Sequence, residues 1–152
     1  MITIRNTQRK IKINTSQLKK DAQTILDELG YADFDLGILI TTNKKMHAYN
    51  KEYRGKDKPT DVLSFPYHTN LKAGQKIKIK SEEDKNLGDL ILAPEYILHD
   101  LPQWNTTFEK HLQRLLVHGM CHLLGYDHID DADYKIMHKK ETILLNLLQK
   151  NA

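Results

Sequence analysis

The sequence predicts an α+β fold: a small mixed sheet of about four strands packed with helices, with the functional site at the end of a central helix. Short apolar runs typical of strands alternate with segments whose apolar residues recur at helical spacing. The chain has 152 residues, enough for one compact domain with a core but hardly for two. We therefore expect residues 1–152 to form a single domain.

The first elements are two strands around a helix. Residues 2–6 and 36–42 are short apolar runs expected to form strands. Between them, apolar residues repeat at helical spacing over residues 16–29, and Gly30 ends the repeat.

The middle of the chain is expected to hold a short helix and two more strands. Asn43 can cap a helix that runs to Tyr53. Strands are predicted at residues 61–65 and 87–92. The lysine-rich residues 72–85 lie between these strands, and we interpret them as an exposed, mobile loop.

The last third is expected to be helical. Pro94 begins a short helix, residues 107–124 form a long one, and Asp130 or Asp131 caps the final one. The final helix is predicted to pack onto the core through Ile136, Ile143, Leu144, Leu147 and Leu148.

Three histidines near the end of the helix predicted at residues 107–124 form the most informative motif. His118 and His122 are four residues apart, so they lie on nearly one helix face, about 6 Å apart along the axis. Gly125 permits the positive φ that ends helices, which lets His128 reach a third position. Three neutral imidazoles suit one Zn²⁺ ion, although Ni²⁺, Co²⁺ or Cu²⁺ can also bind, and they leave a fourth position for water. The motif predicts a metal-dependent hydrolase.

Two neighbours of this motif are given other roles. Cys121 could compete as a ligand, but a lone helical cysteine is typical of a small buried hydrophobe. His111 is about 10 Å further along the axis, so we expect a groove-lining or solvated residue. A single cysteine excludes an intrachain disulfide and fits a reducing compartment.

The spacing is that of the metzincin proteases, His-x-x-x-His-x-x-Gly-x-x-His, except that Gly119 stands where their general-base glutamate follows the first histidine. This difference argues against peptide hydrolysis, because that carboxylate carries the proton from the metal-bound water to the leaving amine.

The longer motif at residues 118–128, His-Gly-x-x-His-Leu-x-Gly-Tyr-Asp-His, resembles the signature of the YbeY family of rRNA-maturation endoribonucleases. Residues 53–66 resemble the family's other signature, and residues 86–94 resemble the strand that follows. The resemblance implies a zincin-like architecture with metal ligands His118, His122 and His128. It also implies a single-strand-specific metallo-endoribonuclease that matures the 16S rRNA 3′ end and serves ribosome quality control.

Arg54 is similar to a functionally important arginine of that family, and its planar guanidinium can donate two hydrogen bonds to a phosphate. The alternative is a surface ion pair with Asp57 or Glu52. Lys56 and Ser64 are candidate substrate-binding residues, although a backbone group would satisfy the Ser64 hydroxyl equally well.

The mechanism expected from these residues starts with a metal ion that lowers the pKa of its bound water toward about 7. The resulting hydroxide can attack phosphorus or deprotonate the ribose 2′-OH, while Arg54 and the metal share the developing charge. Asp127 can fix the tautomer of a ligating imidazole, or it can cap a helix.

Charge is divided unevenly along the chain. Residues 1–80 hold 16 Lys and Arg against 8 Asp and Glu, whereas residues 81–152 hold 7 against 12. A phosphate-contacting surface is therefore expected mainly from the first half. Its densest basic part consists of Lys44, Lys45, Lys51, Arg54, Lys56 and Lys58.

Two other functions stay open at this level. A zinc peptidase of metzincin type would need Asp61 or Asp89 as its base, and a non-catalytic metal-containing RNA- or ribosome-binding factor would close its site with Cys121. The family resemblance implies single-stranded rRNA, the small ribosomal subunit and assembly factors as partners. The chain has neither an apolar run of about 20 residues nor a secretory h-region, so we expect a cytoplasmic protein with no membrane contact.

Overall fold

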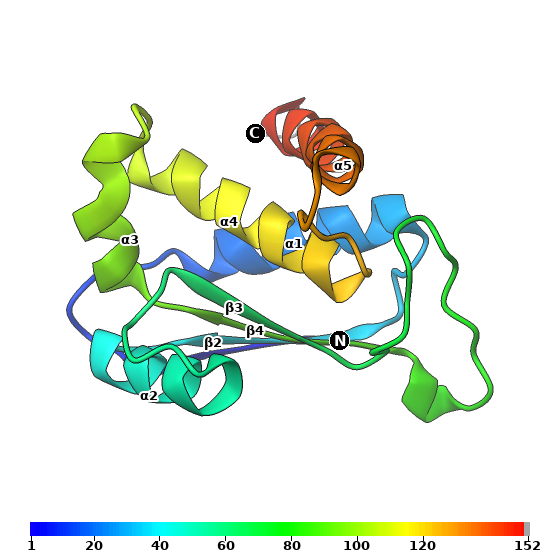
Figure 1. Ribbon diagram of the computed structural model, residues 1–152, viewed down its shortest axis with the longest axis horizontal. Helices are drawn as coiled ribbons and strands as arrows, with labels where there is room; N and C mark the ends of the chain where they lie inside the picture. Colours follow the sequence, from blue (N-terminus) through cyan, green and yellow to red (C-terminus); the bar gives the residue numbers. More distant parts are fainter. Residues whose placement is uncertain (151–152) are drawn as a thin grey trace.

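The computed structural model describes residues 1–150, and its sheet is mixed, with strand order β1-β2-β4-β3 (Figure 1). The strands are β1 (Ile2–Asn6), β2 (Asp35–Ile40), β3 (Val62–Pro66) and β4 (Asn86–Leu92). β1, β2 and β4 run parallel, whereas β3 lies at one edge and pairs antiparallel with β4. This sheet, packed with helices, confirms the predicted α+β class.

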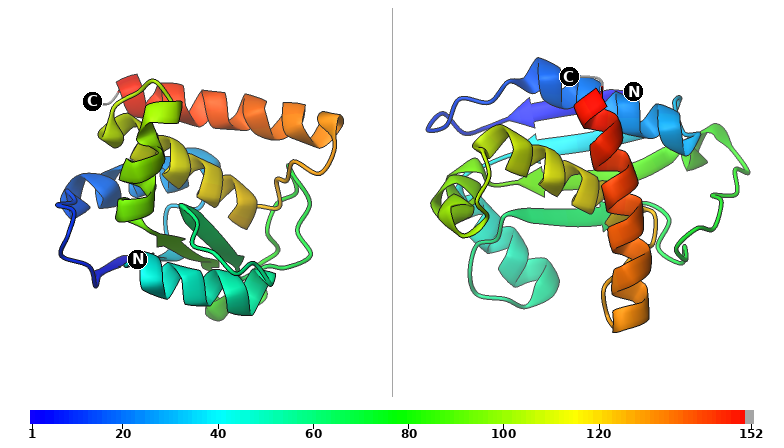
Figure 2. Two further views of the ribbon diagram at one scale, coloured as in Figure 1. Left: turned by 60° about the vertical axis from the view of Figure 1, so that its left-hand side comes forward. Right: turned by 90° about the horizontal axis from the view of Figure 1, so that it is seen from above.

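Helices cover both faces of the sheet unequally. They are α1 (Thr15–Leu29), α2 (Asn43–Arg54), α3 (Pro94–Asp100), α4 (Phe108–Leu123) and α5 (Asp131–Lys150). α1 and α4 lie on one face, with α5 crossing them on the side away from the sheet, and α2 lies beneath the other face (Figures 1 and 2). None of the helices within residues 1–150 is both long and apolar enough to cross a membrane.

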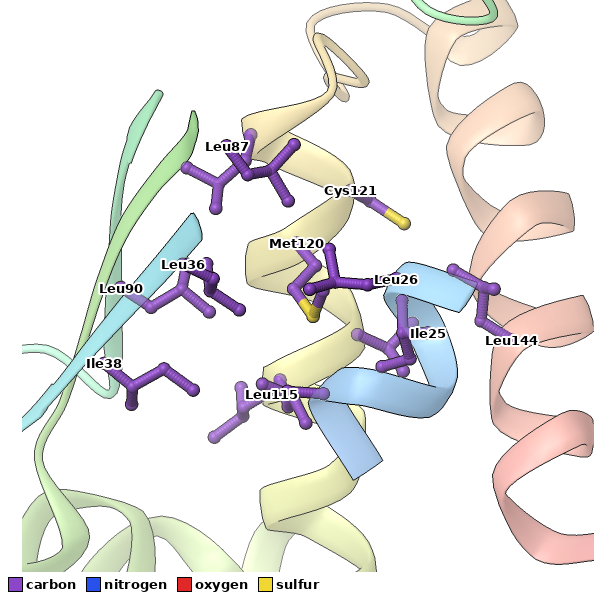
Figure 3. Packing of buried hydrophobic residues seen from close by; sticks show 14 of the residues in the cluster. Ile25, Leu26, Leu36, Ile38, Leu87, Leu90, Leu115, Met120, Cys121 and Leu144 are labelled. Carbon is purple, nitrogen blue, oxygen red and sulfur yellow. The ribbon is translucent and has the colours of Figure 1, made fainter. Parts of the chain in front are cut away.

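The main core fills the space between the sheet, α1 and α4 (Figure 3). Alternate residues of β2 face this space, as the period of two in a strand requires, and the register shift between β2 and β4 near Gly88 lets both Leu87 and Leu90 face it too. Figure 3 shows side chains from the sheet, from both helices and from α5 meeting there: Leu36, Ile38, Leu87, Leu90, Ile25, Leu26, Leu115, Met120 and Leu144. α4 is therefore fixed against the sheet along most of its length, which holds its histidine face in a defined place.

The predicted element bounds are largely confirmed, with one capping error. β1 matches the expected residues, and β2 stops two residues before the expected end. Thr42, and not Asn43, caps α2, because the Thr42 hydroxyl accepts a hydrogen bond from the Lys45 N–H at 3.2 Å. Asn43 is the first helical residue, and its amide donates to Glu95 at 3.4 Å.

The packing face of α5 differs from the expected one. Asp130 is the cap, since its carboxylate accepts from the Asp133 N–H at 2.8 Å. Ile136 and Ile143, expected in the core, are 53% and 47% exposed, while Met137 is buried. Leu144 and Leu148 are buried as predicted, and Leu147 is half-buried. Spacings of 7 and 4 residues from Met137 through Leu144 to Leu148 trace the stripe that packs toward the core.

The lysine-rich segment is exposed at its lysines but attached to the core between them. Lys76 and Lys78 are exposed, whereas Ile77 is buried, and its N–H donates to the Tyr31 hydroxyl at 3.2 Å. A short 3₁₀ helix, Glu82–Asp84, then leads into β4.

His111 is not the solvated or groove-lining residue that the sequence suggested. It is 1% exposed, neither ring nitrogen has a hydrogen-bond partner among the described residues, and its ring lies 4.9 Å from that of Trp104. Burial lowers the pKa of His111; nearby Asp61 and Asp100 oppose this shift, and Arg114 adds to it. The imidazole is therefore held neutral in the fold.

This neutral histidine should make the protein less stable in mild acid. The unfolded chain takes up a proton at His111 near pH 6.5 and the folded chain resists it, so the free energy of unfolding falls as the pH drops below that value. We expect His111→Phe to reduce this slope by the share of one group, at most about 1.4 kcal/mol per pH unit, while His122, whose pKa is also lowered, keeps its own share. Denaturant unfolding of both proteins at about pH 7.5 and about pH 5.5, followed by the fluorescence of the single Trp104, measures it. The exposed His99, changed to Phe, is the control; equal slopes in wild type and His111→Phe would refute the assignment.

Candidate metal centre

The three predicted histidines meet at the carboxyl end of α4. One ring nitrogen of each of His118, His122 and His128 lies within 4.8 Å of the others. His118 and His122 come from successive turns of α4, and His128 comes from the segment between α4 and α5. The chain therefore brings together a cluster that can hold a metal ion, as the spacing predicted.

Hydrogen bonds at the outer nitrogens fix how two of these rings point. His118 Nδ1 lies 2.9 Å from Glu141 Oε2, and His122 Nδ1 lies 2.9 Å from the carbonyl oxygen of Tyr126. A carbonyl, and a carboxylate in its ionised form, only accept, so each Nδ1 carries the proton and donates. In the neutral rings both Nε2 atoms are then left as unprotonated, ligand-type nitrogens.

The distance between these two nitrogens suits a cation bound by both. His118 Nε2 and His122 Nε2 are 3.1 Å apart, and two unprotonated lone pairs at this distance repel unless a positive charge lies between them. Tetrahedral zinc with Zn–N bonds of about 2.05 Å places two nitrogens about 3.3 Å apart. The residues present therefore fit a metal with imidazole ligands.

Burial keeps His122 ready as a ligand. It lowers the pKa of His122 to about 4, with the neighbouring His118 and His128 adding to the shift and Asp127 and the Tyr126 carbonyl opposing it. A neutral ring at ordinary pH is the form that coordinates metals.

Gly125 makes the turn that brings His128 back. Its φ is +88°, and a Cβ at this position would clash with the backbone of Leu71. The Gly125 N–H donates to the His122 carbonyl at 3.0 Å, and the Tyr126 N–H donates to the Cys121 carbonyl at 3.1 Å. This ending resembles the left-handed helix terminations for which glycine is preferred, as the sequence indicated.

Glu141 is a neighbour of the histidine cluster that sequence reasoning missed. It lies on α5, 23 residues beyond His118, and its side chain is only 17% exposed. Burial alone would raise the pKa of Glu141, but the hydrogen bond from His118 and the nearby Arg114 and His138 lower it overall. No local pattern marks this residue, because the contact depends on how α5 crosses α4.

Asp127 was the sequence candidate for holding a ligand imidazole. In the structure its carboxylate accepts from the backbone N–H of His128 at 2.8 Å, which shapes the turn before the third histidine. The ring partners are Glu141 for His118 and the Tyr126 carbonyl for His122.

Removing Glu141 should weaken metal binding without removing a ligand. Partners that orient metal-bound histidines typically contribute 10- to 100-fold in affinity, so we expect Glu141→Ala to lose about that much. Glu141→Gln keeps a hydrogen-bond acceptor but not the charge, so its zinc affinity should lie between those of wild type and Glu141→Ala. Zinc affinity measured by competition with a chromophoric chelator checks this, with the exposed Glu28→Gln on α1 as control. Unchanged affinity in Glu141→Ala would show that the contact is only structural.

The histidines open into a cleft of about 680 Å³ between α4 and the edge strand β3. Arg54, at the end of α2, also lines this cleft, and no ion pair of Arg54 with Asp57 or Glu52 is present within residues 1–150. Asp57 instead pairs with His47 at 2.7 Å. The predicted phosphate-binding residue and the histidine cluster thus share one cavity.

Other predicted residues are placed less centrally. Ser64 borders the cleft, but its hydroxyl donates to the Gly119 carbonyl at 3.1 Å, which is the backbone-satisfied alternative. Lys56 is exposed just beyond Arg54 and is not among the residues that line the cleft. His68, given no role from the sequence, does line it, with its Nε2 held 2.8 Å from the Asp84 carbonyl.

The packing of α4 leaves little space at Gly119, the position where the metzincin pattern has glutamate. A Cβ at Gly119 would lie 2.9 Å from Leu90 Cδ2 and 3.4 Å from Ser64 Oγ, so the helix approaches β3 and β4 closely here. A larger side chain at this position would require the Leu90 side chain to shift or α4 to move away from the sheet.

Of the residues that the alternative functions require, Asp89 and Cys121 lie outside the cleft, whereas Asp61 borders it. Asp89 lines a hollow on the other face of the sheet, and Asp61 borders the cleft with its carboxylate accepting from the Val62 N–H at 2.7 Å. Cys121 lies in the core, directed toward α5 (Figure 3), and burial raises the pKa of its thiol to about 12. It is not part of the histidine cluster, so it does not close the site as a fourth ligand.

A mixed sheet backing a helix with two histidines, followed by a glycine turn and a third histidine, defines a zincin-like protein of the α+β class. Comparison with known proteins then gives the family. A family model described as endoribonuclease YbeY matches residues 3–149. The chain therefore belongs to the YbeY family of endoribonucleases, which confirms the resemblance seen in its motifs.

Individual relatives agree with this assignment. The chain is 40% identical over 147 residues to human endoribonuclease YbeY, covering 97% of this chain and 87% of the relative. It is 36% identical over 145 residues to endoribonuclease YbeY of Clostridioides difficile, covering 93% and 92%. The solution structure of a Thermotoga maritima protein shares the fold, with a TM-score of 0.64 at 24% identity, covering 99% of this chain and 91% of that one.

Proposed function

We propose that this chain is a single-strand-specific metallo-endoribonuclease that matures the 3′ end of 16S rRNA and serves ribosome quality control. The observation that carries the proposal is the shared cleft, which is lined both by the three-histidine cluster and by Arg54, an arginine without an ion pair among residues 1–150. Its proposed partners are single-stranded rRNA, the small ribosomal subunit and assembly factors, and its proposed place is therefore the cytoplasm. Residues 1–152 are taken as one functional domain.

We assign the metal ligands as His118, His122 and His128, and Zn²⁺ as the ion. When bound, zinc supplies Lewis acidity that activates water at neutral pH, so a protein carboxylate in the place of Gly119 is not needed. Glu141 and the Tyr126 carbonyl hold the Nδ1 protons of His118 and His122, and this keeps both rings in the ligating tautomer.

Arg54 is assigned to the substrate phosphate. Arg54 lines the cleft, and a guanidinium can donate two parallel hydrogen bonds to phosphodiester oxygens. The same group offsets the negative charge that grows on those oxygens as the P–O bond breaks. Lys56 and the other exposed lysines near it would add a general attraction for the RNA backbone that weakens with salt.

The test is cleavage of a labelled single-stranded RNA that carries the 3′ end of the small-subunit rRNA. We expect the zinc-loaded protein to cut it, a chelator to stop cutting, and added zinc to restore it. A duplex of the same sequence should resist cleavage.

Zinc should also raise the melting temperature of the protein. A ligand that binds only the folded state stabilises it by about 2.7 kcal/mol when the free ligand is at about 100 times its Kd. Cleavage that continues unchanged in chelator would contradict the proposal.

A further inference from the structure

Tyr53 lies where two hollows of the molecule meet. One hollow is the cleft that holds the histidines, and the other, of about 540 Å³, lies on the face of the sheet that α2 covers only in part. Tyr53 and Phe65 line both hollows. β3 is the edge strand, so a chain lying in the cleft can pass around this rim onto the other face.

The Tyr53 ring is exposed, yet its neighbours hold it in place. The residue is 59% exposed; its ring meets Phe65 edge-on, with centroids 5.1 Å apart, and lies nearly parallel to Tyr49 at 6.4 Å. Tyr49 and Phe65 are themselves anchored on a small buried cluster on this face, formed by Met46, Leu63, Ile91 and Ala93. A single exposed tyrosine is ordinary on a protein surface, but an aromatic ring fixed by two anchored rings at the rim of a cleft is a preorganised contact surface.

The surrounding charge indicates what would lie against this ring. Arg54, the next residue, borders the cleft, and Lys51, Lys56 and Lys58 are exposed close by in the chain. The second hollow offers no comparable excess of positive charge, because Asp35 and Asp89 line it together with Arg5, and Asp35 pairs with the N-terminal ammonium at 2.8 Å. Positive charge on the cleft side and an uncharged aromatic surface at the rim suit a nucleotide whose phosphate stays near Arg54 and whose base extends outward.

We propose that Tyr53, held by Tyr49 and Phe65, is a stacking site for the nucleobase next to the phosphate at Arg54. The inference rests on the proposed function for its substrate, single-stranded RNA, and adds a base-binding position to it. Bases stack on aromatic rings with little regard to sequence, because every base has a π face. A duplex keeps its bases paired and stacked on each other, so a site of this kind also favours single strands.

The first measurement is equilibrium binding of a short fluorescent single-stranded RNA, 2′-O-methylated to slow cleavage, by fluorescence anisotropy on the zinc-loaded protein. We expect Tyr53→Ala to weaken binding by about 10-fold, within the range for loss of one base–aromatic contact. Tyr53→Phe keeps the ring and should bind within about two-fold of wild type. Tyr134→Ala is the matched control, since Tyr134 is 55% exposed and also stacks on a neighbour, His138, but lies on α5 outside both hollows.

An abasic scan then tests whether the ring contacts a base. Single nucleotides of the RNA are replaced in turn by abasic residues, and affinity is measured for wild type and Tyr53→Ala. Stacking predicts one position at which the abasic change weakens wild type but has no further effect in Tyr53→Ala. Equal losses in both proteins at every position, or a loss in Tyr53→Phe as large as in Tyr53→Ala, would overturn the proposal.

The outcomes separate this inference from the proposed function. If wild type cleaves unmodified RNA but Tyr53→Ala binds RNA as tightly as wild type, the stacking site is refuted and the proposed nuclease function is retained. The exposed ring of Tyr53 would then belong to another surface, such as a protein contact. RNA binding that depends on Tyr53 in a protein that cleaves no RNA supports the stacking site and refutes the nuclease. Circular dichroism of each variant confirms that the fold is retained.

Discussion

Replacing His122 with alanine is expected to abolish metal-dependent RNA cleavage and to reduce zinc affinity by more than about 100-fold, beyond the loss typical of a residue that only orients a ligand. His122 is half-buried at the end of α4, with its tautomer held by the Tyr126 carbonyl. Its removal leaves two histidines at the cluster, too few to hold a zinc ion tightly.

Zinc content after dialysis, chelator competition and cleavage of the labelled RNA measure this effect. The substitution also leaves the Tyr126 carbonyl without its donor, so a loss of about 1–3 kcal/mol in unfolding free energy is expected and must be measured beside it. His99→Ala, at an exposed site on α3, is the matched control. Undiminished zinc binding by a folded His122→Ala protein would show that the three-histidine assignment is wrong.

Replacing Arg54 with alanine is expected to lower kcat for RNA cleavage by about 10²- to 10³-fold, the usual effect of losing one group that stabilises transition-state charge. Zinc affinity should not change, because Arg54 is on α2 and is not part of the histidine cluster. Arg54→Lys keeps the positive charge but cannot donate two parallel hydrogen bonds, so its kcat should lie between those of wild type and Arg54→Ala.

The control for Arg54 is Lys45→Ala, which removes an exposed positive charge near the other end of α2. Single-turnover cleavage with saturating enzyme separates the chemical step from RNA binding. Thermal unfolding should change little, since the favourable contact of Arg54 with the carboxyl end of the helix contributes about 0.3–1 kcal/mol. Equal single-turnover rates in Arg54→Ala and wild type would show that Arg54 is an ordinary surface residue with no part in the chemical step.

The histidine cluster could be predicted from sequence because its geometry is local. His118 and His122 are related by one helical turn, and Gly125 supplies the positive φ that brings back His128 three residues later. All of these relations lie within 11 residues, where the backbone periods and the special freedom of glycine determine positions without knowledge of the rest of the fold.

The strands and most helix bounds could be predicted for the same reason, since apolar periodicity and caps act over a few residues. The error at α2 is instructive. Thr42 and Asn43 are both good capping residues; β2 ends at Ile40, two residues earlier than expected, and Thr42 is the extended residue that caps α2.

What only the tertiary structure decided is which distant surfaces meet. Met137 rather than Ile136 is buried, and Glu141 reaches His118, because of the angle at which α5 crosses α4. The burial of His111 against Trp104 likewise depends on the segment between α3 and α4 folding over the start of α4. The sequence by itself determined the local ligand set and the periodicity of each element. Contacts between elements depend on the free energy of packing whole faces together, and no short stretch of sequence contains that information.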